Sequence, residues 1–165
     1  MALLPTTEID EQPEINESEC EIQGSRREVR SLIFHLLYTM EMYDYDVSLD
    51  FLIGTFNNNF DVDIEPDGEI ANSAYAIIES RQFLDNYIQP LLSNWRLERI
   101  GVCTKLVLRL AIWELLNTKI DPKIIINEAI ELAKCFSERD AYKFVNGILD
   151  EALKRQGISI EPAQS

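Results

Sequence analysis

The chain has 165 residues, and 46% of them are hydrophobic, which is enough for one domain with a buried core. The formal net charge of −14 argues against a protein that binds nucleic acid through bulk positive charge. The three cysteines have no metal-ligand spacing and indicate reduced thiols. The sequence shows no signal peptide and no apolar run long enough to cross a membrane, so it predicts a soluble, cytoplasmic protein.

Acidic residues are concentrated at the N-terminus. Residues 1–24 contain seven acids, no Lys or Arg, and no apolar period. Of the 29 acids in the chain, 22 then remain against 15 bases, so half of the net charge belongs to this segment. We predict a disordered acidic leader at 1–24, a helical domain at 25–157 and a flexible tail at 158–165.

The sequence from Ser25 onward shows helical periodicity. Ser25 and Glu28 have capping-box spacing, and the apolar residues from Val29 to Met40 recur every three or four positions. Gly157 stands where a glycine commonly ends a helix. The helices predicted from periodicity, caps and prolines lie at about 25–43, 48–58, 66–88, 101–117, 122–136 and 141–156, with a short turn or helix near Trp95.

Residues 101–117 are apolar nearly all round, which is typical of a central helix. We find no alternating pattern of the kind that predicts strands. The fold class is therefore predicted to be all-α, a compact bundle of six to seven helices.

Basic residues gather at the start of the first predicted helix. Arg26, Arg27 and Arg30 lie where cations oppose the helix dipole, although Glu28 interrupts the cluster. Arginine forms bidentate hydrogen bonds to phosphate, so an anion or RNA contact is one interpretation. A solvated cluster without function is the other.

Two further basic sites have alternative explanations. Lys105 and Arg109 lie four apart on the central helix, so their face must reach solvent, a ligand or an acid, the acid being Glu114 from a neighbouring turn or one on another helix. Lys143 lies beside Phe144 and four residues after Arg139, a combination that suits single-stranded RNA but equally fits a solvated face over a core phenylalanine.

Phe34, Tyr38 and Glu41 form a second stripe on the first helix, off its core face, which we interpret as a partner site or as packing against the second or third helix. The single histidine, His35, has no Ser or Cys placed to pair with it and is expected on the solvent side. We find no phosphate-binding glycine loop and no metal-ligand pattern, so we predict no enzyme activity, cofactor or metal.

Several segments combine residues that periodicity alone does not require. They are Arg26–Arg30 leading to Leu37-Tyr38, Trp95 with Arg99-Ile100, Leu108–Leu115, Ile126–Lys134 and Phe144–Asp150. Together, from Ser25 to about Lys154, they resemble the NusB family of bacterial transcription antitermination factors.

The resemblance implies two three-helix lobes and a non-enzymatic role. It implies binding of boxA RNA together with NusE, a ribosomal protein, in a complex on RNA polymerase that suppresses termination in ribosomal RNA operons. Carried over to this sequence, the resemblance implies RNA contacts at Arg26, Arg27, Arg30, Arg109, Asp140, Lys143 and Phe144. It implies that NusE binds at Tyr38, and we include Phe34 and Glu41 of the same stripe in the expected NusE site. The alternatives are a protein-interaction bundle or homodimer without RNA binding, and a relative of the RNA-binding domain of ribosomal RNA cytosine methyltransferases.

Overall fold

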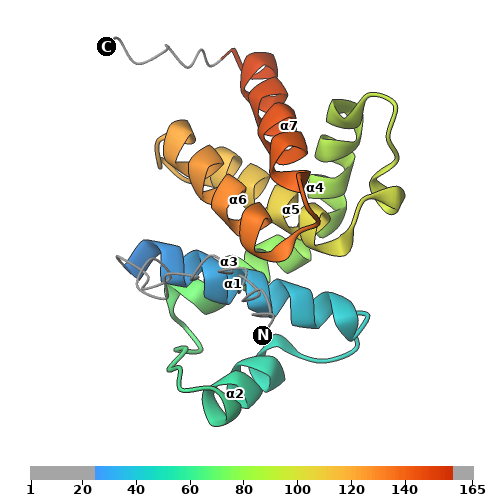
Figure 1. Cartoon of the computed structure of the whole chain (residues 1–165). Coiled ribbons are helices and arrows are strands. Elements are labelled where there is room, and N and C mark those ends of the chain that lie inside the picture. The colour runs from blue at the N-terminus through green and yellow to red at the C-terminus, as the bar shows by residue number, and fades with distance from the viewer. Residues whose placement is uncertain (1–24, 158–165) are drawn as a thin grey trace, which may run out of the picture.

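The computed structural model describes residues 25–157, and all the regular structure within them is helical (Figure 1). The elements are α1 (Ser25–Met42), α2 (Leu49–Asn59), α3 (Glu69–Glu79), α4 (Arg81–Ile88), η1 (Gln89–Leu92), η2 (Leu97–Arg99), α5 (Val102–Asn117), α6 (Pro122–Phe136) and α7 (Ala141–Arg155). The all-α prediction is confirmed. The predicted leader and tail lie outside the described residues. Among those described, none of the helices combines the length and hydropathy needed to span a bilayer.

Helix ends follow the local signals in the sequence. The Ser48 hydroxyl accepts a hydrogen bond from the Phe51 amide at 3.1 Å and so caps α2. Asp121 caps α6 by accepting from the Lys123 amide at 2.9 Å. Gly157 follows α7 with a φ of +71°, a conformation that glycine adopts without strain. These caps explain why the predicted boundaries of α2, α6 and α7 agree with the structure to within a residue or two.

The predicted third helix, 66–88, is wrong as a single element. It is divided at Ser80 into α3 and α4, and α3 begins at Glu69. The Ser80 hydroxyl donates to the Ala76 carbonyl at 2.6 Å, and the Arg81 guanidinium donates to the Ile78 carbonyl at 2.8 Å. These side chains bond carbonyls in the last turn of α3, which lets the chain change direction there.

The helices form two lobes that meet at α1 and α5 (Figure 1). Helices α1, α2 and α3 pack on one another, and α4, α5, α6 and α7 form the second group. The second lobe has four helices instead of the expected three because the break at Ser80 assigns α3 to one lobe and α4 to the other. Helix α5 packs against α1, α3, α4, α6 and α7, so it is the central helix that its sequence predicts.

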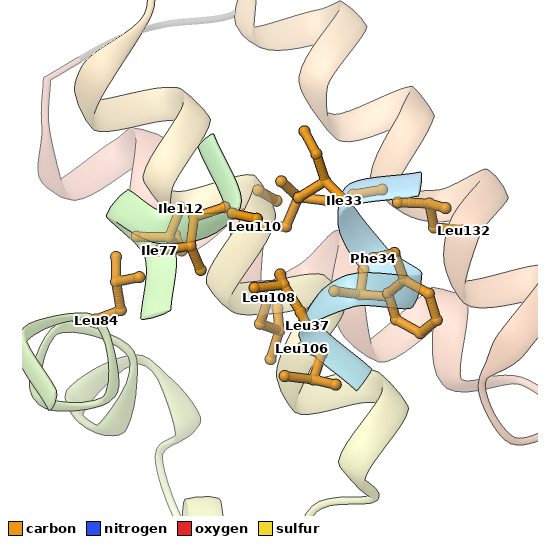
Figure 2. Packing of buried hydrophobic residues seen from close by; sticks show 14 of the residues in the cluster. Ile33, Phe34, Leu37, Ile77, Leu84, Leu106, Leu108, Leu110, Ile112 and Leu132 are labelled. Atoms are coloured by element: carbon orange, nitrogen blue, oxygen red, sulfur yellow. The ribbon is translucent and has the colours of Figure 1, made fainter. Parts of the chain in front are cut away.

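One hydrophobic core runs through both lobes (Figure 2). Leu37 of α1 and Ile77 of α3 belong to the same cluster as Leu84 of α4 and Leu108 of α5, and all four are almost completely buried. Each such side chain contributes roughly 1.5–3 kcal/mol relative to an exposed position. Because α5 supplies apolar contacts on nearly every side, a polar group on this helix must find a partner inside the protein.

Candidate nucleic-acid interface

The first turn of α1 carries two exposed arginines, and each is held by an acid from another helix. Arg26 Nη1 lies 2.5 Å from Glu69 Oε1 of α3. Arg27 donates two hydrogen bonds to Glu128 of α6, from Nε to Oε2 and from Nη2 to Oε1, both of 3.1 Å. The hydrogen bond and charge of Glu128 raise the pKa of Arg27. The Arg27 side chain is still 47% exposed, so a phosphate can reach it in competition with Glu128.

Arg30, the third arginine of this helix, is buried. Its guanidinium makes three hydrogen bonds to the Glu114 carboxylate of α5, of 2.9, 3.1 and 3.0 Å. Both residues are only 5% exposed. Arg30 therefore connects α1 to the central helix, and we remove it from the set of candidate RNA contacts.

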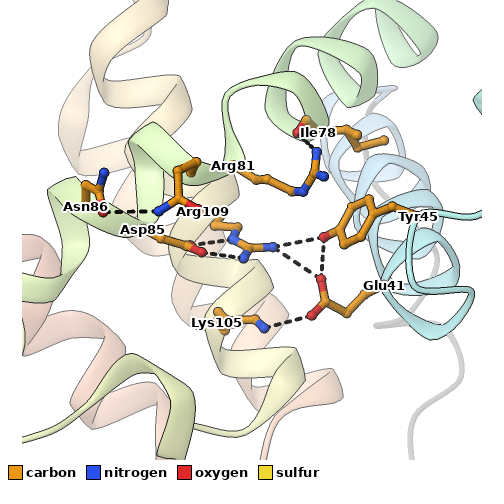
Figure 3. A network of polar contacts seen from close by, with 9 residues as sticks. Glu41, Tyr45, Ile78, Arg81, Asp85, Asn86, Lys105 and Arg109 are labelled. Atoms are coloured by element: carbon orange, nitrogen blue, oxygen red, sulfur yellow. Dashed lines mark hydrogen bonds and ion pairs between the residues drawn. The ribbon is translucent and has the colours of Figure 1, made fainter.

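Arg109 is buried in a second polar network, shown in Figure 3. Its Nε and Nη2 atoms each lie 2.7 Å from an oxygen of Asp85 on α4. Its Nη1 atom donates to Glu41 at 3.3 Å and to the Tyr45 hydroxyl at 3.1 Å. Lys105 donates to the other Glu41 oxygen at 2.8 Å, and the Tyr45 hydroxyl donates to Glu41. Of the two alternatives for Arg109, the structure therefore selects acids from other helices.

The ionisation of this network follows from its burial and pairing. Burial alone would lower the pKa of Arg109, but the hydrogen bonds and charge of Asp85 outweigh it and raise that pKa. Burial would likewise raise the pKa of Glu41, yet bonds from Lys105 and Tyr45 hold it below its ordinary value. Burial and the bond to Glu41 raise the pKa of Tyr45 to about 12. At neutral pH Arg109 and Glu41 therefore stay charged and Tyr45 stays neutral. The network ties α1 to α4 and α5.

The stripe predicted on α1 divides between core and surface. Phe34 is 2% exposed and stacks on Phe136 of α6 with ring centroids 4.8 Å apart, so the expectation that it lies off the core face is wrong. The expected solvent-side position of His35 is also wrong, since its ring packs edge-on against Phe136 and burial lowers its pKa. Glu41 belongs to the network around Arg109. Tyr38, at 37% exposure, is the member of the stripe that faces solvent.

The first turn of α7 brings three predicted residues together. Asp140 precedes it with a φ of +66°, and its carboxylate lies 3.7 Å from Lys143 Nζ, both side chains being exposed. Phe144 is half-buried and lines a pocket of about 260 Å³ whose other walls come from the segment before α5, the first turn of α5 and the turn between α6 and α7. A cation beside a partly exposed ring on one helical turn suits a phosphate and its base.

The two exposed sets lie at different points along α6. Arg27 meets α6 at Glu128, whereas α7 begins shortly after Phe136 at the C-terminal end of α6. At 1.5 Å per residue these points on α6 are about 12 Å apart. The positions that the sequence predicts thus form two separate contact areas, and Arg30 and Arg109 lie inside the protein.

The loop at 93–99 is not among the sites predicted from the sequence. Trp95 in this loop is among the most exposed large side chains, and Arg96 and Arg99 beside it are exposed as well. An aromatic between Asn94 and Arg96, in a segment outside the helical periodicity, is the sequence signal that could have indicated it.

Solved structures share this two-lobe helical fold. NusB of T. maritima superposes with a TM-score of 0.70 and 33% identity, covering 79% of this chain and 92% of that one. A structure of the antitermination factors NusB and NusE in complex with dsRNA gives a TM-score of 0.66 over 79% of this chain and 96% of that chain. The latter is 22% identical and shows the common fold. The class defined by this fold is that of the all-helical NusB-like proteins.

Sequence comparison specifies the family. The NusB family model matches residues 27–154. The transcription antitermination protein NusB of Staphylococcus carnosus is 40% identical over 129 residues, which cover 76% of this chain and 96% of that protein. The NusB protein of Macrococcus caseolyticus is 33% identical over 136 residues, covering 80% and 98%. This chain belongs to the NusB family, as its sequence motifs indicate.

Proposed function

We propose that this protein is a transcription antitermination factor that binds the boxA RNA of ribosomal RNA operons together with NusE. The observation that carries the proposal is the family match over residues 27–154, with relatives at 33% and 40% identity that are named for antitermination. A protein of the same fold has a structure with NusE and dsRNA. The family assignment also makes the protein an RNA-binding factor and not an enzyme. Assembly with RNA polymerase is part of the same proposal.

We assign the RNA contacts to the exposed members of the predicted set. Arg26 and Arg27 offer guanidinium forks for phosphates, and Lys143 offers a third cation. Phe144 offers a ring edge for a base, and Asp140 holds Lys143 beside it. Arg30 and Arg109 act indirectly in this proposal, because they fix the packing of α1 on α4 and α5.

We assign NusE to the exposed face of α1 around Tyr38. Its neighbours Met42 and Tyr43 are both about half exposed, so the C-terminal half of α1 presents apolar surface to solvent. Such a patch on a soluble domain commonly marks a protein-binding site. The buried ring of Phe34 stacks against the ring of Tyr38, with their centroids 6.5 Å apart.

Three exposed cations make a weak RNA site. For single strands the logarithm of affinity falls with the logarithm of salt concentration by about 0.7 per phosphate neutralised, so Arg26, Arg27 and Lys143 together predict a slope of about −2. Affinity and selectivity must therefore come partly from a partner that extends the surface, which is the role we assign to NusE.

A titration of labelled boxA RNA and of a scrambled RNA, each with and without NusE, tests this function. We expect NusE to tighten binding and to increase the preference for boxA. Arg27→Ala should weaken binding to both RNAs alike, whereas Phe144→Ala should cost more on boxA. Lys154→Ala is the matched control, because Lys154 is an exposed cation in the last turn of α7, away from the first turns of α1 and α7. Absence of RNA binding with and without NusE, together with a dimer in sedimentation, would favour the protein-interaction alternative.

A further inference from the structure

Most arginines of the described residues are bound within the protein, and the exceptions lie together. Of the nine arginines at 25–157, six have a side chain bonded to an acid or to a backbone carbonyl. The side chains of Arg96, Arg99 and Arg139 make no such bond in this part of the chain. In a protein with 29 acids, three arginines left without an acid in one place indicate a site for an external anion.

These three arginines line two pockets that share Trp95 and Arg99. Arg99, in η2, and Arg139, in the turn between α6 and α7, line the same pocket as Phe144. Arg96 and Arg99 line the adjoining depression. Trp95 lines both, so it shares these pockets with arginines from two separate segments of the chain.

Trp95 is held in an exposed position by a rigid loop. Its side chain is 60% exposed. The Gln89 side chain donates to the Trp95 carbonyl at 2.9 Å and accepts from the Leu97 amide at 3.1 Å. The Trp95 amide donates to the Leu92 carbonyl at 3.0 Å, and both leucines are buried. These hydrogen bonds fix the backbone of the loop with the indole facing solvent. Ligand binding therefore loses little conformational entropy of the loop backbone.

Two acids, Glu138 and Asp140, also line this pocket. The Glu138 carboxylate lies against Gly101, where an added Cβ would come within 2.7 Å of its Oε1 atom. Asp140 pairs with Lys143. Neither carboxylate is bonded to Arg99 or Arg139, which leaves both guanidinium groups available. The volume of about 260 Å³ is slightly below the usual size of a pocket for a drug-sized ligand and suits one flat ring system.

We propose that Trp95, Arg99 and Arg139 bind one unpaired nucleobase of single-stranded RNA and its flanking phosphates. Arg96 would contact a phosphate of the neighbouring nucleotide. This inference rests on the proposed function and extends the RNA surface from the first turn of α7 to the loop at 93–99. An indole stacks on any base, and guanidinium groups bind phosphate. A base inside a duplex cannot offer its face to Trp95, so the site selects unpaired RNA.

Trp95 fluorescence and affinity measurements on the full chain test the proposal. The chain has two tryptophans, Trp95 and Trp113, so Trp113→Phe leaves Trp95 as the only one. A single-stranded boxA oligonucleotide should quench its emission, and the same oligonucleotide annealed to its complement should not. Trp95→Ala, in the otherwise unsubstituted chain, should weaken single-strand binding about 5- to 100-fold, and Trp95→Phe should restore most of it.

The charge of the pocket is tested separately. Replacing Arg99 and Arg139 together by alanine should reduce the salt slope of single-strand binding by about 1.4. Phe51→Ala removes a ring that is 57% exposed on α2 and is the control variant. It should bind RNA like the unsubstituted chain.

The outcomes separate this site from the proposed function. If the unsubstituted chain binds boxA RNA and Trp95→Ala binds it equally well, the pocket is not a base site, while the antitermination proposal stands. An equal loss for single-stranded and duplex RNA would overturn the stacking role. Failure of the unsubstituted chain to bind RNA, even with NusE, would overturn the proposed function and this inference with it.

Discussion

Replacing Arg30 by alanine distinguishes a structural arginine from an RNA-binding one. The substitution leaves the Glu114 carboxylate, 5% exposed, without the three hydrogen bonds of 2.9 to 3.1 Å that Arg30 supplies. Removing one partner of a buried ion pair costs about 3–5 kcal/mol, because an uncompensated charge stays in a medium of low dielectric constant. We expect Arg30→Ala to lower the free energy of unfolding by this amount.

The expected loss is large enough to measure by thermal unfolding. For a domain of this size, 1 kcal/mol shifts the melting temperature by about 3–4 °C, so Arg30→Ala should melt roughly 10–20 °C below the unsubstituted protein. Arg26→Ala is the matched control, because the Arg26–Glu69 pair is exposed and such pairs contribute about 1 kcal/mol or less. Replacing Arg30 by methionine and Glu114 by leucine together should recover most of the loss, since apolar pairs of similar volume replace buried ion pairs without penalty.

One result would refute this reasoning. If Arg30→Ala melted within about 2 °C of the unsubstituted protein and lost as much RNA affinity as Arg27→Ala, Arg30 would be an RNA contact and the Glu114 pair would be dispensable.

Three other predictions concern the RNA and NusE surfaces. Glu128→Gln removes the charge that competes for the Arg27 fork, so RNA affinity should rise at low salt and this gain should shrink at high salt in a titration; an unchanged affinity would exclude Arg27 from the interface. Phe34→Ala should destabilise the core by about 3–5 kcal/mol in thermal unfolding, whereas Tyr38→Ala should leave stability unchanged and weaken NusE binding in calorimetry; the opposite pattern would contradict the division of this stripe between core and surface. Deleting residues 1–24 removes seven acids and should tighten boxA binding at low salt, and an unaffected affinity would contradict competition between leader and RNA.

The helices themselves were predictable because their signals are local. The all-round apolar pattern of 101–117 predicts a central helix, and α5 is that helix. The break at Ser80 was not predictable in this way, since Ile77, Ile78 and Leu84 continue one helical stripe across it. The break depends on hydrogen bonds to carbonyls near the end of α3, which hydrophobic periodicity does not encode.

The positions of the arginines were less predictable because their partners are distant in the sequence. Arg30 meets an acid 84 residues away, and Arg109 meets one 24 residues away. Family motifs mark both residues as important, but a motif does not state whether a guanidinium faces solvent or a buried carboxylate. Glu128, part of the most distinctive motif, similarly holds Arg27 across 101 residues. Only the packing of the helices shows which arginines stay accessible.

Amide chemical shifts of the isotope-labelled full chain, recorded while boxA RNA and NusE are added, test the central claim most directly. The claim is that RNA lies on the exposed arginines of α1 and on the surface formed by the 93–99 loop and the first turn of α7. We expect RNA-dependent shifts at Arg26, Arg27, 93–99 and 139–144, with α2 unaffected. Shifts confined to α2 and α3, or none at any RNA concentration, would contradict the account.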